Sequence, residues 1–240
     1  MPPRFYCSRP ITPNAPYTLP PEVAHHASRV LRLGLGDRLV LFDGGGGEYP
    51  AVIESSGAQM VVSVGAFDVA ERESPLAITL YQALPTGDKM DLIIQKAVEL
   101  GVHDVVPITA LRCVMKLTGE RAAKRVAHWR GVAVSACEQC GRNRVPQVSE
   151  VMPLATALAE CKAPHRYMLA PGASLRPSMM EAPTGAIALF IGPEGGWSDA
   201  ELAAGKAAGC LPLSLGPRVL RTETAGPAAL SAFAARFGDF

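Results

Sequence analysis

The sequence predicts an α/β protein, with a small β-barrel at the N-terminus followed by a larger domain built on a parallel sheet. Residues 1 to about 70 hold short alternating apolar segments separated by close turns, a pattern typical of a small barrel. From about residue 75 onward, short apolar runs alternate with segments of helical periodicity. Such alternation is typical of a parallel sheet with crossover helices.

The barrel is predicted from its strands, its turns and one helix. Four glycines, Gly44 to Gly47, separate two apolar runs and predict a hairpin loop, and Ser55-Ser56-Gly57 predicts a second turn. Around these turns we expect strands at residues 4–7, 37–43, 48–54 and 59–64, and a short helix at residues 21–31.

A polar segment, residues 70–74, precedes Pro75 and is the best candidate for a linker. We therefore expect one domain at residues 1–70 and a second at residues 75–240. In the second domain we expect strands at residues 76–84, 105–108, 167–170, 186–191 and 211–215, and helices at residues 89–100, 120–140 and 153–160. A terminal helix should run to about Phe237, with Pro227 in its first turn, where proline is tolerated.

The segment from Ala186 to Leu202 joins a strand, a glycine loop and a helix start. Its apolar run is typical of a strand buried on both faces. Gly195-Gly196 permits backbone angles that a side chain would forbid, and Ser198 with Glu201 forms a capping box for the next helix. The loop lies where open α/β sheets bind ligands, although a plain connection between strand and helix also accounts for the glycines.

Several nucleotide and hydrolase motifs are absent from the sequence. It contains no G-x-G-x-x-G after the first strand of the α/β domain, no P-loop and no G-x-S-x-G. Three loops at strand ends remain as the predicted site: residues 170–172, 192–196 and 215–225. Glu194 at the centre of the second loop disfavours phosphate and favours hydroxyls, amines or a sulfonium cation.

Composition excludes few partners. Over 240 residues the net charge is +1, and no apolar run approaches the roughly 20 residues of a membrane span. The first residues do not form a signal peptide, so we expect a cytoplasmic protein. We interpret the six cysteines as buried thiols, and neither Cys137-x-x-Cys140 nor His25-His26 has the further ligands of a metal site, so no metal is predicted.

Basic residues gather in one stretch of the chain. Between residues 112 and 144 there are eight of them against two acids. A polyanion could be held there, and a solvated helix face explains the charge equally well. The eight are Arg112, Lys116, Arg121, Lys124, Arg125, Arg130, Arg142 and Arg144.

Five segments together resemble the ribosomal RNA small subunit methyltransferase E family. They are PRFYC, QKAVELGV, CEQCGRNRVP, IGPEGGWSDAE and LGPRVLRTETA, in the order of the family and across nearly the whole chain. The resemblance implies S-adenosylmethionine as cofactor and methylation of a 16S rRNA uridine at N3. It also implies a PUA-like barrel at the N-terminus, a SPOUT methyltransferase domain with a deep trefoil knot, and a homodimer.

The resemblance assigns the cofactor site to the three loops, mainly through backbone groups. The residues carried over are Leu169 and Ala170 in the first loop, Ile191, Gly192, Pro193, Glu194 and Gly196 in the second, and Leu215, Gly216, Arg218, Leu220, Thr222 and Ala225 in the third.

Methylation at N3 also needs the N3 proton to be removed and the charge that spreads to O2 and O4 to be stabilised. From motif position, Arg221 is the candidate for stabilisation and Glu223 for the base, or for orienting the base. A mutual ion pair that only shapes the loop is the alternative. RNA-contacting candidates are Arg4, Arg9, Arg29, Arg32, Arg112, Lys116, Arg142 and Arg144.

Two other functions stay open from the sequence. One is a SPOUT methyltransferase that acts on another RNA or another base atom. The other is an RNA-binding assembly factor for the small ribosomal subunit that no longer catalyses methylation, although the intact glycine loop and the Arg221-Thr222-Glu223 segment argue against this.

Overall fold

The computed structural model describes residues 2–56 and 59–240. Its contacts group the chain into two compact units, which we describe separately. Unit 1 consists of Met1–Glu73 together with Cys137–Val145, and unit 2 of Ser74–Ala136 together with Pro146–Phe240.

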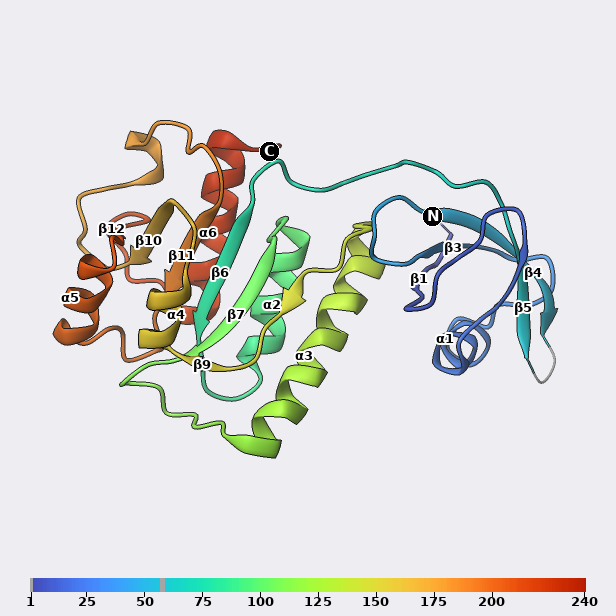
Figure 1. Ribbon diagram of the computed structural model, residues 1–240, viewed down its shortest axis with the longest axis horizontal. Helices are drawn as coiled ribbons and strands as arrows, with labels where there is room; N and C mark the ends of the chain where they lie inside the picture. Colours follow the sequence, from blue (N-terminus) through green and yellow to red (C-terminus); the bar gives the residue numbers. More distant parts are fainter. Residues whose placement is uncertain (1, 57–58) are drawn as a thin grey trace. The chain divides into compact units, whose positions relative to one another are not determined.

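Unit 1 contains a five-stranded sheet and one short helical segment (Figure 1). The strand order is β1-β3-β4-β5-β2, in which β1 runs parallel to β3 and the other neighbours are antiparallel. The inward residues of the strands, among them Phe5, Leu41 and Val62, form its core. The elements are β1 (Arg4–Tyr6), β2 (Pro16–Thr18), α1 (Pro21–His25), which continues as a π-helix (His26–Val30), β3 (Arg38–Phe42), β4 (Tyr49–Ser56) and β5 (Met60–Val64).

The predicted strands and helix of this unit are confirmed, with one addition. Strand β2 was missed because its three residues are exposed or half-buried and carry no alternating apolar signal. Of the predicted turn after β4, Gly57 lies outside the described residues, and Ser55 and Ser56 still belong to the strand.

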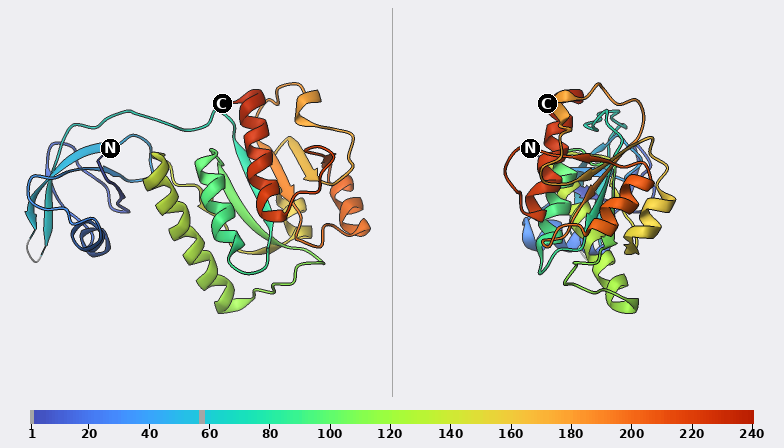
Figure 2. Two further views of the ribbon diagram at one scale, coloured as in Figure 1. Left: turned by 180° about the vertical axis from the view of Figure 1, so that it is seen from behind. Right: turned by 90° about the vertical axis from the view of Figure 1, so that its left-hand side faces the viewer.

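Unit 2 is built on a wholly parallel sheet. Its strand order is β12-β10-β11-β6-β7-β8, and β9 also pairs with β7. Helices α2 and α6 lie on one face, and α4 and α5 on the other (Figures 1 and 2). The elements are β6 (Ile78–Ala83), α2 (Lys89–Glu99), β7 (Asp104–Thr109), β8 (Gln147–Val148), β9 (Met152–Pro153), α4 (Leu154–Glu160), β10 (His165–Leu169), a 3-10 turn (Pro177–Met179), β11 (Ile187–Ile191), α5 (Asp199–Ala207), β12 (Leu211–Leu213) and α6 (Thr222–Phe237).

The central strands of the sheet consist mainly of apolar residues, because helices cover both faces of the sheet. All five residues of β11 are buried, as the continuous apolar run predicts. Helix α3 (Gly119–Cys140) buries Val126, Trp129 and Ala133 on one stripe, which confirms its predicted amphipathic pattern.

The predicted place of Pro227 is wrong. Helix α6 begins at Thr222, so Pro227 lies inside it rather than in its first turn. The residue before a proline is normally forced out of the helical region by its own Cβ, and Gly226 has none. The glycine also packs closely, since an added Cβ would meet Gln82 Oε1 at 3.3 Å. Gly226 therefore permits a helix through Pro227.

The contacts also group residues 137–145 with unit 1, although we expected them in the second domain. The expected linker, residues 70–74, is not a bare connector, because Glu71, Arg72 and Glu73 all make ion pairs within unit 1.

The six cysteines are free thiols, and five of them are buried. Within residues 2–56 and 59–240, no group of three or more His, Cys, Asp or Glu side chains is placed to hold a metal ion. No helix in the same residues is long and apolar enough to cross a membrane.

Candidate active site

A pocket of about 330 Å³ lies in unit 2 at the carboxyl ends of β10, β11 and β12. Since these strands are parallel neighbours, the loops that follow them meet at one edge of the sheet. The volume lies in the range usual for small-molecule sites. All thirteen residues predicted for the cofactor line this pocket, and so do Arg221 and Glu223. Sequence reasoning missed four lining residues outside the three predicted loops, and it did not single out two others, Pro171 and Val219, within them. The four are Lys89, Trp197, Leu213 and Ser214.

Trp197 joins the first two loops. Its indole Nε1 donates a hydrogen bond of 3.0 Å to the carbonyl oxygen of Leu169. The ring also covers Gly192 so closely that an added Cβ would lie 3.2 Å from the ring atom Cε2. The capping box predicted at Ser198 and Glu201 is confirmed, and it fixes the start of α5 just behind this loop.

Thr222 joins the second and third loops. Its hydroxyl donates to the carbonyl oxygen of Gly192 at 2.7 Å and accepts from Gln82 Nε2 at 2.9 Å. Thr222 and Gln82 are both buried. Since a buried polar group is costly to leave unpaired, this chain of hydrogen bonds holds the helix start against the glycine loop.

The pocket combines apolar walls with free backbone donors. Leu169, Ile191 and Leu215 supply apolar side chains from three different loops. Across the residues that the structure describes, the backbone N–H groups of Gly192, Leu215 and Leu220 donate to no other group of the chain. Donors left unpaired in an apolar pocket suit the polar edge of a flat ring.

One ammonium group holds two carboxylates at the pocket. Lys89 Nζ lies 2.9 Å from Glu194 Oε1 and 3.6 Å from Glu223 Oε2. Glu194 Oε1 also accepts the Thr86 backbone N–H at 2.9 Å and the Thr86 hydroxyl at 2.7 Å. Burial raises the pKa of Glu194, but the Thr86 and Lys89 donors outweigh it and lower the pKa to about 2. The hydroxyl and amine groups predicted to bind Glu194 are therefore supplied by Thr86 and Lys89 of the chain itself.

Arg221 takes no part in this ion pairing. Its side chain is exposed, and it forms no ion pair within the described part of the chain. The carboxylate of Glu223 pairs with Lys89 instead, so the alternative of an Arg221–Glu223 ion pair is wrong. Arg221 therefore lines the pocket with its guanidinium available to another molecule.

The comparisons with known proteins agree with this geometry. Residues 72–234 match the model of an RNA methyltransferase domain, and residues 19–61 match that of an RNA methyltransferase PUA domain. The "Ribosomal RNA small subunit methyltransferase E" of Buchnera aphidicola is 30% identical over 99% of this chain and 97% of its own length. The protein of that name in Bacillus subtilis is 33% identical over 90% of this chain and 88% of its own.

The chain belongs to the ribosomal RNA small subunit methyltransferase E family.

Solved structures of similar chains confirm the fold of this methyltransferase. The ribosomal RNA small subunit methyltransferase E of Neisseria gonorrhoeae, solved with S-adenosyl methionine, is 36% identical, and each chain covers 100% of the other with a TM-score of 0.94. A Legionella pneumophila protein, also solved with this cofactor, is 39% identical with the same coverage and a TM-score of 0.96. The predicted PUA-like and SPOUT domains are therefore confirmed, while the trefoil knot remains a prediction.

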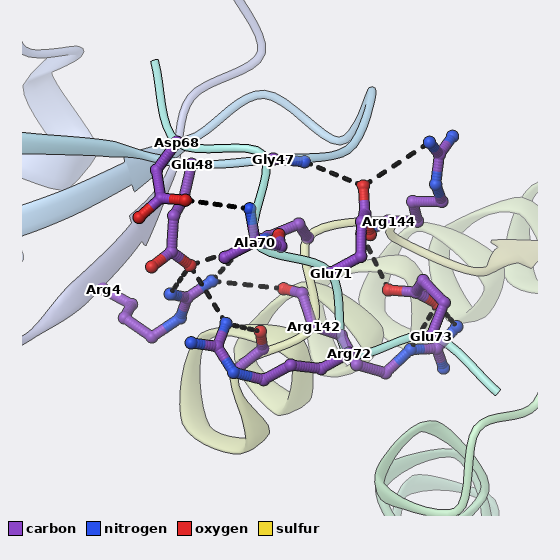
Figure 3. A network of polar contacts seen from close by, with 12 residues as sticks. Arg4, Gly47, Glu48, Asp68, Ala70, Glu71, Arg72, Glu73, Arg142 and Arg144 are labelled. Atoms are coloured by element: carbon purple, nitrogen blue, oxygen red, sulfur yellow. Dashed lines mark hydrogen bonds and ion pairs between the residues drawn. The ribbon is translucent and has the colours of Figure 1, made fainter. Parts of the chain in front are cut away.

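Two of the arginines proposed to contact RNA form buried ion pairs with carboxylates of unit 1 in this methyltransferase. Arg4 and Arg72 both bind the carboxylate of Glu48, and Arg142 binds that of Glu73 (Figure 3). The side chains of Arg4 and Arg142 are only 8% and 6% exposed. We therefore give these two arginines a structural role within unit 1 and leave them out of the RNA-contacting set.

The other RNA candidates are exposed. Arg144 is 58% exposed and contacts Glu71 at 3.5 Å. Arg112 contacts the glycine loop, where its guanidinium donates a hydrogen bond of 2.9 Å to the carbonyl oxygen of Gly195. The remaining exposed candidates are Arg9, Arg29, Arg32 and Lys116.

The contact between Gly192 and Trp197 leads to a first prediction. Gly192→Ala should weaken cofactor binding, because the new methyl group pushes the indole away from the Leu169 carbonyl and so disturbs two walls of the pocket. Overpacking of this kind costs about 1–3 kcal/mol, which corresponds to a rise of about 5- to 150-fold in the Kd for S-adenosylmethionine, measured by calorimetry.

Gly131→Ala is the matched control for this prediction. Gly131 lies within α3, and an added Cβ would meet nothing within 4 Å. This variant should leave the Kd unchanged. An unchanged Kd for Gly192→Ala as well would show that the indole does not shape the cofactor pocket.

Proposed function

We propose that this chain transfers a methyl group from S-adenosylmethionine to N3 of a uridine in the 16S rRNA of the small ribosomal subunit. The observation that carries the proposal is the pocket itself, where three loops bring apolar walls, backbone donors without a partner among the described residues, and an exposed arginine to one edge of the sheet. Relatives solved with this cofactor support the proposal. An rRNA substrate also places the reaction in the cytoplasm.

The residues present fit this cofactor. Leu169, Ile191 and Leu215 would enclose the adenine ring, and the unpaired N–H groups of Gly192, Leu215 and Leu220 would bind its polar edge. When bound, S-adenosylmethionine supplies an electrophilic methyl group whose sulfur leaves as a neutral thioether.

Glu223 is the proposed base. Its Oε2 is buried at the pocket and accepts no hydrogen bond from the described residues, so it has room for a proton. Proton transfer from N3 to this carboxylate leaves the electron pair of the broken N–H bond on the nucleobase. That pair forms the bond from N3 to the methyl carbon as the bond from carbon to sulfur breaks.

Arg221 is the proposed stabiliser of the developing charge. Loss of the N3 proton spreads negative charge to O2 and O4 of the base, and a planar guanidinium can donate to one of these oxygens. Arg221 is next to Thr222, whose hydrogen bond to Gly192 holds the start of α6. The guanidinium therefore extends from a fixed backbone position.

The RNA is proposed to be held by the exposed basic residues of both units and by a second copy of the chain. Arg9, Arg29, Arg32 and Arg144 in unit 1, and Arg112 and Lys116 in unit 2, would bind phosphates and set the position of the strand. The target base must leave its stack to reach the pocket. A homodimer, in which one subunit presents RNA to the other, completes this proposal.

The test is to incubate the protein with labelled S-adenosylmethionine and small ribosomal subunits that lack modification, and then to map the labelled nucleotide. The expected product is one 16S uridine methylated at N3. Naked 16S rRNA forms the parallel arm, which distinguishes assembled from free substrate. Label at another atom or in another RNA would overturn the proposed specificity, and no label in any RNA would overturn the catalytic function.

A further inference from the structure

Lys89 is a charged residue of the pocket that no motif in the sequence selects. It is the first residue of α2, about 100 residues before the loops that form the rest of the site. Its ammonium contacts carboxylates from two of those loops, Glu194 after β11 and Glu223 at the start of α6. The hydrogen bond to Glu194 is the main reason that the pKa of Lys89 is raised, so the group stays charged at neutral pH.

The two carboxylates differ in how they are held. Glu194 is fixed by Thr86 and Lys89, and its lowered pKa keeps it ionised at neutral pH. Within the described part of the chain, the buried Oε2 of Glu223 accepts no hydrogen bond, and its contact with Lys89 is longer than that of Glu194. Glu223 is thus the loosely held member of the pair and lies close to a permanent negative charge.

The charged groups that line the pocket with Glu223 come from three elements. Lys89 comes from α2, Glu194 from the second loop, and Arg218 and Arg221 from the third. Both arginines are exposed to solvent, where charge interactions are screened. Asp88, the neighbour of Lys89, is paired with Arg125 at 3.1 Å. Lys89 is therefore the cation in direct contact with Glu223.

We propose that Lys89 is a positioning residue for methyl transfer, whose ammonium keeps the carboxylate of Glu223 ionised and in place beside Glu194. Without this cation, two carboxylates would share one site, and such pairs keep a proton because like charges at short range cannot both ionise. A protonated Glu223 cannot accept the proton from N3. The inference rests on the proposed function, in which Glu223 is the base.

The first measurement is independent of catalysis. Carbon-13 NMR of glutamate carboxyl groups follows the titration of Glu223 in the free protein, and the loss of one resonance in Glu223→Gln assigns it. In Lys89→Met, the titration of Glu223 should move to higher pH, because the cation is gone and the carboxylate of Glu194 remains close to Glu223. Lys89→Arg keeps the cation and should keep the titration of the parent protein.

The second measurement follows the methylation rate against pH. The acid limb of the profile for Lys89→Met should move to higher pH by the same amount as the pKa of Glu223. In the double variant Lys89→Met with Glu194→Gln, both the pKa and the limb should return toward those of the parent protein, because the repelling charge is gone while Thr86 can still donate to the amide oxygen.

Lys124→Met is the matched control, since Lys124 pairs with Glu120 at 2.8 Å on an exposed face of α3. It should leave the titration of Glu223 unchanged. The proposal is overturned if Glu223 titrates alike in Lys89→Met and the parent protein, or if Lys89→Met only raises the KM for S-adenosylmethionine. An inactive parent protein in which the titration of Glu223 still shifts would refute the proposed function and leave only the control of Glu223 ionisation by Lys89 standing.

Discussion

Replacing Glu223 by glutamine is expected to lower kcat for RNA methylation by about 10²- to 10⁴-fold, the usual contribution of a general base. The amide keeps the size of the side chain and cannot accept the N3 proton. The parent enzyme should lose rate as the pH falls and Glu223 becomes protonated, whereas the variant should lack that limb. Single-turnover rates at a series of pH values, with small subunits as substrate, measure both effects.

Binding of the cofactor is the control for this variant. Thr222, Gly192 and Trp197, which hold the walls of the pocket together, are unchanged, so the Kd for S-adenosylmethionine should stay within about threefold of the parent value. Full activity with an unchanged pH profile would refute the assignment of Glu223 as the base. A large loss of cofactor affinity would instead give Glu223 a binding role.

The second large effect is expected in unit 1, where Glu48→Ala should lower the free energy of unfolding by about 3–5 kcal/mol. Glu48 is the carboxylate that neutralises Arg4, whose side chain is only 8% exposed (Figure 3). Removing it leaves a buried guanidinium without its ion pair, and also takes from Arg72 its carboxylate partner at 3.1 Å, so that the carbonyl oxygen of Gly141 remains as its acceptor. Urea denaturation of the parent and the variant, followed by circular dichroism, measures the difference.

The control for this loss of stability is Glu120→Ala. Glu120 pairs with Lys124 with both side chains at least 76% exposed, and such pairs contribute at most about 1 kcal/mol. Similar losses for the two glutamates would contradict a buried role for Glu48.

The stabilisation by Glu48 should also depend on pH. Burial raises the pKa of Glu48, but the hydrogen bonds from Arg4 and Arg72 outweigh it and hold the pKa below the ordinary value of 4.5. A carboxyl whose pKa is lowered by folding stabilises the protein above its unfolded pKa and loses this effect as the pH falls through its folded pKa. The difference between Glu48→Gln and the parent should therefore be full at pH 7 and shrink below about pH 4.5.

Short-range sequence patterns predicted most of the pocket residues, because the pocket loops directly follow strands that appear in the sequence as short apolar runs. The buried run of β11, the glycines after it and the capping box at Ser198 are all contiguous signals. Parallel strands bring their following loops to one edge, so the fold class already implied that the three loops meet. Only the family resemblance identified the ligand, since glycine loops alone are shared by many sites.

Lys89 shows where local pattern fails. At the start of α2 it has no unusual neighbour in sequence, and its partners lie more than 100 residues away. The buried ion pairs of Arg4 and Arg142 were missed for the same reason, because nothing in the sequence distinguishes an arginine paired with a distant carboxylate from one available to RNA. The prediction for Pro227 applied the rule that proline is tolerated only in the first turn of a helix. Gly226 and its close packing permit an exception to that rule.

Most strands and helices, the parallel sheet, the three loops and, through the motifs, the family followed from the amino-acid sequence, whereas the short strands β2, β8 and β9 did not. These features depend on short-range periodicity and turn chemistry, which a single chain displays without its partners. The tertiary structure alone decided which charges meet: Lys89 with Glu194 and Glu223, and Glu48 with Arg4 and Arg72. Ion pairs between distant segments depend on three-dimensional proximity and burial, and neither is encoded by residue spacing.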